Sequence, residues 1–217
     1  REIVAQKPTG LAKLLRSVKW SDANAVRETH RLLRGWPKLA PHLALELLDA
    51  KFADQEVRGY ATRCLESLTD AQMQQILLQL VQVLKYEPTH SSPLAKFILR
   101  RSLMNRNQIG FSLYWLLRSE MHVPSVRVRY GVLLEAYLRG CGEYRGEFEK
   151  QLHVLKPLER IAMLIKDTPK ETRLRVLRAE LAKLEFPRTG VQLPIDPRFV
   201  VNGLVIDKCK YMDSKKL

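Results

Sequence analysis

The twelve residues from Leu77 to Pro88, LLQLVQVLKYEP, indicate the kind of fold that this chain adopts. The stretch begins with leucine, valine and glutamine only, and charge returns at Lys85 and Glu87. Its apolar residues cover most of the circumference of a helix, and a helix of that kind is buried between neighbours instead of lying on a surface. The stretch therefore predicts an inner helix, sandwiched between helical hairpins.

Helical spacing of apolar residues continues on both sides of this stretch, from Thr9 to about Phe186. Segments of about 12 to 20 residues carry apolar residues three and four positions apart, which is typical of amphipathic helices. Residues that cap or open helices separate the segments, at Ser21–Asp22, Pro41, Asp54, Thr69–Asp70, Ser91–Pro93, Asn105 or Asn107, and Pro124. Leu43, Leu45, Leu47 and Leu48 fall in the helix opened by Pro41, and GFSLYWLLRSEM in the helix that begins at Asn105 or Asn107. The helix opened by Pro124 is predicted to end at Gly140-Cys141-Gly142, and later helices are predicted from Glu147 to Lys166 and from Pro169 to Glu185.

One segment has the pattern of a helical repeat. The spacing D-x-x-V-R-x-x-A at Asp54, Val57, Arg58 and Ala61 resembles the second helix of HEAT-type repeats, with a looser echo at Pro124–Arg129. We expect Asp54 to cap its helix and Arg58 to pair with a carboxylate or carbonyl of the adjoining repeat. Helical hairpins that bury their apolar faces only against neighbours form a solenoid. The predicted fold is therefore all-α, an α-α superhelix (HEAT/armadillo-like solenoid) with a short extended C-terminal segment.

The composition changes after Phe186. The segment PRTGVQLPIDPRF (187–199) holds three prolines and a glycine and is predicted to be a linker. The next segment is rich in β-branched residues, and Leu204–Met212 is predicted to be a strand whose apolar face carries Leu204 and Ile206. We expect two domains, a helical domain at 1–186 and a linker with a first strand at 187–217.

The chain is strongly basic. Its 37 lysines and arginines outnumber 23 aspartates and glutamates, a net charge of +14 over 217 residues. The stretch from Lys96 to Arg129 holds seven basic residues against Glu120 alone. Such an excess suits nucleic acid or an acidic membrane surface, and it equally suits a solvated face. Which of these the stretch faces is left open, as is the oligomeric state.

Composition also bounds the compartment. Hydrophobic residues make up 46% and charged residues 28%, as in folded proteins that are not membrane-spanning. No apolar run approaches the roughly 20 residues that a bilayer span requires, and Arg1-Glu2 opens no secretory signal. We therefore expect a cytoplasmic protein.

The motifs of common catalytic and metal sites are missing from the sequence. Three cysteines and five histidines are scattered without CxxC or HExxH spacing: Cys64, Cys141, Cys209, His30, His42, His90, His122 and His153. There is no P-loop or GxSxG elbow, and the glycine cluster at Gly140–Gly146 follows a helix, as a helix terminator does. Glu46, Asp49, Asp54 and Glu56 lie around a helix junction, where caps and surface pairs explain them. We predict no catalytic, cofactor-binding or metal-binding residue here.

Seven stretches together resemble one family, the helical domain of class I phosphoinositide 3-kinase catalytic subunits. They occur in the same order as in the family: AKLLRSVKW, WPKLAP with LALELLD, DQEVRGYATRCLESL, LLQLVQVLKYEP, NRNQIGFSLYWLLRSEMH, LLEAYLRGCG and DKCKYMDSKK. The likeness runs from about Leu11 to Leu217 and is weakest from Glu143 to Arg188. LLEAYLRGCG is closer to the isoform coupled to G-protein βγ, and VRGYATRCLE to isoforms held by Src-homology regulatory subunits. The isoform and the regulatory subunit are therefore left open.

This resemblance implies a parent enzyme that transfers the γ-phosphate of ATP to the 3-hydroxyl of phosphatidylinositol 4,5-bisphosphate. The chain would be the helical (PIK accessory) scaffold of that enzyme and would run into the first strand of the kinase N-lobe, while ATP and Mg²⁺ would bind elsewhere in the parent. The implied partners are other domains of the same kinase chain, a regulatory subunit, Ras and G-protein βγ, with no nucleic acid. The parent would be cytoplasmic and recruited to the inner face of the plasma membrane.

Without the resemblance, an all-α repeat protein that lacks catalytic motifs indicates an interaction module. The alternative function is therefore an independent HEAT-like adaptor or a nucleic-acid-binding solenoid whose basic stretch is the binding surface. The parent gene distinguishes the two functions, because only the kinase hypothesis requires an ATP pocket encoded beyond Leu217.

Overall fold

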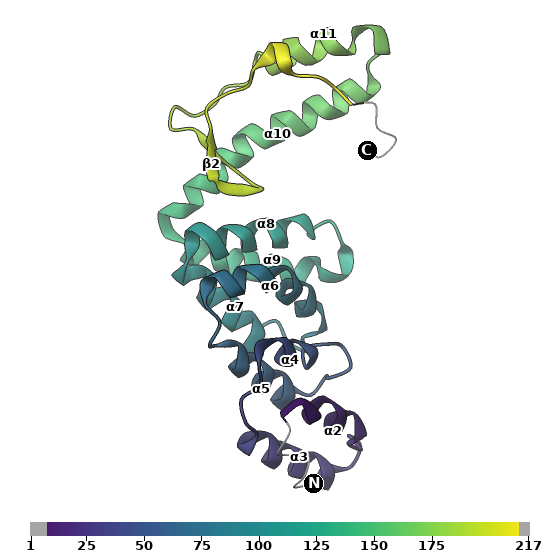
Figure 1. Cartoon of the computed structure of the whole chain (residues 1–217). Helices are drawn as coiled ribbons and strands as arrows, with labels where there is room; N and C mark the ends of the chain where they lie inside the picture. The colour runs from purple at the N-terminus through teal and green to yellow at the C-terminus, as the bar shows by residue number, and fades with distance from the viewer. Residues whose placement is uncertain (1–7, 213–217) are drawn as a thin grey trace. The chain divides into compact units, whose positions relative to one another are not determined.

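The structure, a computed structural model, describes residues 8–212 (Figure 1). These residues form ten α-helices and one antiparallel β-hairpin, which confirms the predicted all-α fold with a short extended C-terminal segment. They group into two compact units, one ending at Cys141 and the other beginning at Gly142. The family-based domain boundary after residue 186 stays a prediction.

The first unit is a row of helix pairs (Figure 1). Its helices are α2 (Leu11–Ser17), α3 (Ala23–Gly35), α4 (Pro41–Glu46), α5 (Gln55–Leu65), α6 (Asp70–Val83), α7 (Pro93–Met104), α8 (Phe111–Ser119) and α9 (Pro124–Gly140). Short helical turns are η1 (Pro8–Gly10), η2 (Leu84–Tyr86) and the π-helix η3 (Arg106–Gly110). In one layer α3 packs on α5, α5 on α7 and α7 on α9, while α6 packs on α8 in the other. Each helix thus contacts its neighbours along the row, as in a solenoid.

Side-chain caps begin the helices where the sequence predicts them. The Asp22 carboxylate accepts from the Asn24 N–H at the start of α3, and Thr69 forms a capping box with Gln72 at the start of α6. Ser92 caps α7 through the N–H of Ala95. These caps satisfy amide groups that the first turn of a helix leaves without partners.

Three details of the first unit differ from the prediction. Helix α6 buries one stripe only, and its Leu78 is 52% exposed, because glutamines interrupt the apolar surface on the remaining sides. It is therefore not sandwiched on all sides. Helix α4 ends at Glu46, so that Leu47 and Leu48 lie buried in the turn that follows it. The helix after Asn105 opens with the π-turn η3 before α8 begins.

The second unit holds two long helices and a hairpin. It consists of η4 (Gly142–Tyr144), α10 (Arg145–Asp167), α11 (Lys170–Leu181), β1 (Val191–Leu193), β2 (Asp196–Val201) and η5 (Ile206–Lys208). Its core is formed by Ile161, Ile165, Leu177 and Leu181, against which Leu158, Val176, Leu184, Ile206, Cys209 and Tyr211 pack.

The predicted end of the helix opened by Pro124 is confirmed. Helix α9 ends at Gly140, and Gly142 then adopts a positive φ of 61°.

The strand predicted at Leu204–Met212 is wrong. The extended pairing lies earlier, where Val191 pairs with Val201 and Leu193 with Asp196 across a two-residue turn. A local turn supplies a partner strand at once, whereas residues after Val201 have no such partner among those described and form η5 instead. The segment 187–199, predicted as a linker, therefore carries most of the hairpin. Ser214–Lys216, where the family would turn into a second strand, lie outside the described residues.

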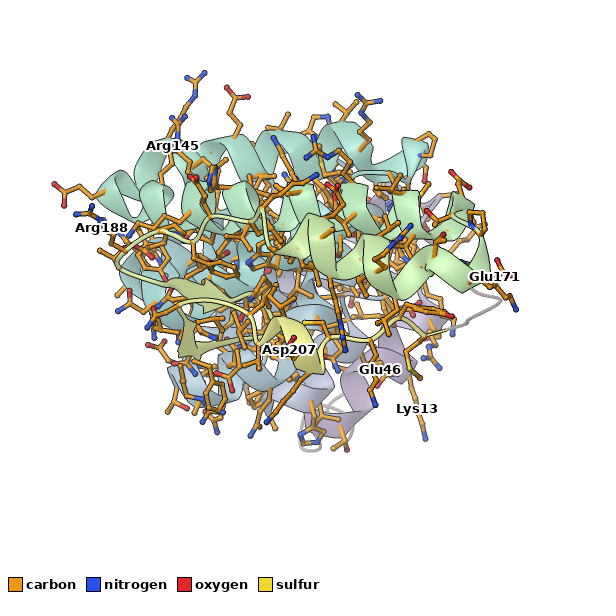
Figure 2. The ribbon with its side chains drawn as sticks, turned by 90° about the horizontal axis from the view of Figure 1, so that it is seen from above. Lys13, Glu46, Arg145, Glu171, Arg188 and Asp207 are labelled. Atoms are coloured by element: carbon orange, nitrogen blue, oxygen red, sulfur yellow. The ribbon has the colours of Figure 1, made fainter. Side chains whose placement is uncertain are left out.

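Among the described residues, no helix combines the length and the hydrophobicity that crossing a bilayer requires. Charged side chains instead project from the ribbon, such as those of Lys13 and Arg145 in Figure 2.

Candidate functional site

The most elaborate polar arrangement in the first unit surrounds Arg58, on the second turn of α5. Asp54 precedes this helix and accepts hydrogen bonds from the N–H groups of Glu56 and Val57, both at 3.0 Å, so the predicted cap is confirmed. The same carboxylate lies 3.0 Å from Nε2 of His30 on α3. Asp54 therefore both starts α5 and links it to the preceding helix of its layer.

Arg58 is fully buried and joins α5 to the end of the α6 segment. Its guanidinium contacts the Glu87 carboxylate through Nε at 2.6 Å and through a terminal nitrogen at 2.5 Å, and both side chains are 1% exposed. It also donates to the backbone carbonyls of Phe52 at 3.1 Å, Asp49 at 3.3 Å and Val83 at 3.4 Å. The prediction that Arg58 pairs with the adjoining repeat is confirmed. We call this cluster the Arg58 joint.

A second joint connects α6 with α7. The Arg101 guanidinium donates to one oxygen of Asp70 at 2.7 Å, and the Asn105 amide donates to the other at 2.8 Å. The Arg101 hydrogen bond, and after it that of Asn105, lowers the pKa of Asp70 from its ordinary value. One carboxylate in the first turn of α6 thus holds both the last turns of α7 and the residue that caps η3.

Buried tyrosines tie other elements together. The Tyr130 hydroxyl on α9 donates to the Val81 carbonyl of α6 at 2.8 Å, and burial raises its pKa to about 12. The Tyr60 hydroxyl on α5 donates to the Pro37 carbonyl at 2.6 Å, and burial raises its pKa as well. Each hydroxyl links segments that lie more than twenty positions apart in the sequence. Together with the two joints, these bonds cross-link successive helices of the row.

The basic stretch at 96–129 is partly used inside the fold. Arg101 belongs to the second joint, Arg100 pairs with Glu66, and Arg129 donates to the Thr89 carbonyl at 2.8 Å. Lys96 and Arg127 are exposed. The local charge excess is therefore not one free binding surface, and what its exposed members face stays open.

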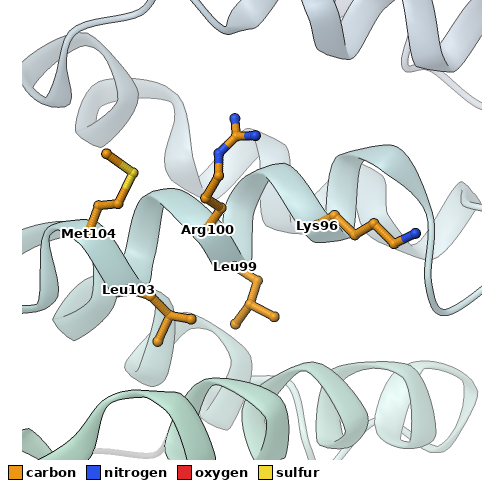
Figure 3. Close-up of a pocket in the computed structure, with 5 residues that line it drawn as sticks. All are labelled: Lys96, Leu99, Arg100, Leu103 and Met104. Carbon is orange, nitrogen blue, oxygen red and sulfur yellow. The ribbon is translucent and has the colours of Figure 1, made fainter.

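A pocket of about 370 Å³ lies along α7 (Figure 3). Its lining residues recur at helical spacing, and they are Lys96, Leu99, Arg100, Leu103 and Met104. They offer apolar contact and positive charge but no carboxylate, imidazole or thiol. This lining suits binding by shape and charge better than acid–base chemistry.

The predicted absence of catalytic, cofactor and metal sites stays a prediction. Within residues 8–212, no three histidine, cysteine, aspartate or glutamate side chains come together as metal ligands would. The side chains of Cys64 and Cys141 are buried, and that of Cys209 is half-buried. Of the carboxylates at the α4–α5 junction, Asp54 is a cap and Glu46 pairs with Arg16 at 2.8 Å on the surface, as expected.

Glu87 is the residue of the Arg58 joint that the sequence reasoning missed. It follows a long apolar run and precedes a proline, and Lys85 is the only other charged residue between positions 71 and 95. An isolated carboxylate at the end of a buried helix could have signalled a buried partner, because unpaired charges are almost never fully buried. The separation of 29 positions from Arg58 hid the pairing.

Comparisons with known proteins agree on one family. Residues 1–150 match the family model described as phosphoinositide 3-kinase family, accessory domain (PIK domain). The chain is similar to phosphatidylinositol 3-kinase 2 of Dictyostelium discoideum, with 50% identity over 218 residues and 100% of the chain covered. Phosphatidylinositol 3-kinases 1 and 3 of the same organism are 48% and 36% identical, each over 97% of the chain. The chain spans only 12% of the first relative and 13% of each of the other two.

Proposed function

Because this chain belongs to the phosphoinositide 3-kinase accessory-domain (PIK domain) family, we propose that it is the stiff helical support on which the other domains of a lipid kinase are held. The observation that carries the proposal is the Arg58 joint, a fully buried ion pair with three additional carbonyl acceptors at the contact between successive helix pairs. A buried pair of this kind tolerates little distortion, because either charge left alone costs several kcal/mol. A row of helices fixed in this way holds attached domains in register.

The proposed parent enzyme transfers the γ-phosphate of ATP to the 3-hydroxyl of phosphatidylinositol 4,5-bisphosphate. The names of the three relatives support a phosphatidylinositol 3-kinase. ATP and Mg²⁺ bind in the parent outside this chain, and the chain contributes to catalysis by positioning alone. A regulatory subunit, Ras and G-protein βγ act on the parent, which is cytoplasmic and recruited to the inner face of the plasma membrane. Release of a partner from the support would shift the parent between two domain arrangements.

The experiment uses the full-length protein that contains this chain. Vesicles carrying phosphatidylinositol 4,5-bisphosphate are incubated with ATP and Mg²⁺, and the 3-phosphorylated product is quantified over a range of temperatures. Glu87→Gln should lower the temperature at which activity is lost, while Glu66→Gln, which removes only an exposed pair with Arg100, should leave it almost unchanged. A wild type that forms no 3-phosphorylated lipid would overturn the kinase proposal. Activity that survives unfolding of α5 and α6, as measured by hydrogen exchange, would overturn the supporting role.

A further inference from the structure

Helix α3 carries three arginines on one face. Arg27, Arg31 and Arg34 are spaced by four and three residues, so that their side chains follow one stripe along the helix. All three are exposed, whereas Thr29 and Leu33 on the other side are buried. Helix α3 packs on α5 and lies in the first helix pair of the row (Figure 1). We call the three residues the arginine face.

The arginine face carries more positive than negative charge: Glu28 is the one carboxylate in the sequence of α3, and its side chain is exposed. Arg27 donates to the Asn24 side chain at 2.5 Å and Arg34 to the His30 carbonyl at 3.4 Å, and neither acceptor is charged. Between residues 8 and 212, none of the three guanidinium groups forms an ion pair. Several arginines elsewhere are neutralised instead, as Arg58 is by Glu87. Three neighbouring guanidinium groups therefore give this face a positive electrostatic potential, in a chain whose net charge is +14.

We propose that the arginine face binds an anionic lipid surface. This choice of partner rests on the proposed function, since a lipid kinase works where its substrate head groups lie. Guanidinium groups bind phosphate oxygens in pairs of hydrogen bonds, and three of them along a straight helix can reach one plane together. Trp20 lies two residues before Asp22, the residue that caps α3, and it is 39% exposed. A half-exposed indole suits the boundary between head groups and acyl chains.

The size of the effect follows from the number of charges. A basic side chain close to an anionic leaflet strengthens binding about fivefold, so three acting together account for roughly a hundredfold. Because these side chains are exposed to water, added salt should weaken the binding steeply.

Vesicle co-sedimentation of the 217-residue chain tests this inference. The probes are phosphatidylcholine vesicles with and without phosphatidylserine, and circular dichroism checks that each variant is folded. The unmutated 217-residue chain should bind only the anionic vesicles. The triple variant Arg27→Gln/Arg31→Gln/Arg34→Gln should bind them roughly a hundredfold more weakly. Glutamine is a good helix former, so this change removes charge with little effect on α3.

The matched control removes the same charge elsewhere. Arg127, Arg160 and Arg175 are exposed and form no ion pair within the described region, and all three are replaced by glutamine. This control should lose less than a few-fold in binding. Equal losses for the two triple variants would overturn the inference, because binding would then follow net charge and not the arginine face. The inference would also be overturned if the unmutated chain did not bind phosphatidylserine vesicles, or if it bound duplex DNA in preference to them.

The two proposals fail in different ways. Kinase activity of the full-length wild type is measured on a water-soluble short-chain phosphoinositide, with no vesicle present. Kinase activity on this soluble substrate, combined with vesicle binding that does not depend on the arginine face, would overturn only the present inference. Vesicle binding that depends on the arginine face, in a full-length protein without kinase activity, would overturn the proposed function and leave the lipid surface as the partner.

Discussion

Removing one partner of the Arg58 joint should destabilise the first unit far more than removing both. The pair is 1% exposed on each side, so a single substitution leaves a charge in a site that water does not reach. Breaking a buried pair in this way costs about 3–5 kcal/mol, whereas exchanging both residues for apolar ones is often nearly neutral. The sign and size of this difference test whether the joint is a true buried ion pair.

The contacts of each partner refine these magnitudes. In Glu87→Gln, Arg58 keeps the carbonyl acceptors of Phe52, Asp49 and Val83, so the loss should lie near the lower limit of about 3 kcal/mol. In Arg58→Met, the Glu87 carboxylate loses the only guanidinium that it contacts within the described residues, so the loss should approach about 5 kcal/mol. The double variant Arg58→Met/Glu87→Leu should cost only about 1–2 kcal/mol, mainly because the carbonyls lose a donor.

Urea unfolding followed by circular dichroism gives the free energies, and hydrogen exchange of amides in α5 and α6 isolates the first unit. The three variants form a double-mutant cycle with the parent. If the double variant loses as much as the two single variants added together, the residues are not coupled and the joint is not an ion pair. Single variants within about 1 kcal/mol of the parent would show that water reaches the site.

Three further changes probe the caps and the close packing. Asp54→Ala should cost about 0.5–2 kcal/mol through the lost cap on α5, and Asp54→Asn, which keeps an acceptor, should recover most of it; superimposable denaturation curves for Ala and the parent would contradict the cap. Tyr130→Phe should cost about 1 kcal/mol. Since burial raises the folded pKa of Tyr130 to about 12 from 10.0, its contribution is complete below pH 10 and lost as the pH rises towards 12, so the variant should lack that alkaline decline in thermal scans. Gly110→Ala would place a Cβ 2.6 Å from the Ser102 carbonyl oxygen and should lower the free energy of unfolding by about 1–3 kcal/mol. A Cβ at Gly146 would meet no atom within 4 Å, so Gly146→Ala should be neutral or stabilising in melting experiments.

Local chemistry explains why most helix starts were predictable. Asp22, Thr69 and Ser92 cap the helices assigned to them, because a cap needs only a side-chain acceptor and an amide two or three residues away. The D-x-x-V-R spacing likewise predicted the roles of Asp54 and Arg58. Such signals lie within one helical turn, so a single sequence contains them in full.

Non-local contacts explain the errors. The apolar run in α6 predicted burial on most sides, but the number of helices that cover a face depends on residues far along the chain, and Leu78 stays exposed. The misplaced strand has the same origin, since β-branched residues after Val201 indicate extended structure without showing which segment pairs with it. The prolines of 187–199 predicted a linker, yet the hairpin accommodates two of them. Pro194 lies in the turn, and Pro197 lies in β2 between the paired residues Asp196 and Val200, where the register shifts.

The arginine face shows why charge composition alone could not locate a candidate surface. The basic stretch from Lys96 to Arg129 is the more prominent feature of the sequence, yet some of its cations are paired with carboxylates, as Arg101 is with Asp70. On α3 the arginines are fewer, but helical spacing places them on one face, and none of them forms an ion pair with another described residue. What matters for an anionic partner is the charge that folding leaves unpaired on one face, because paired cations attract little beyond their own partner. A surface of this kind becomes visible only when the pairing of every cation around it is known.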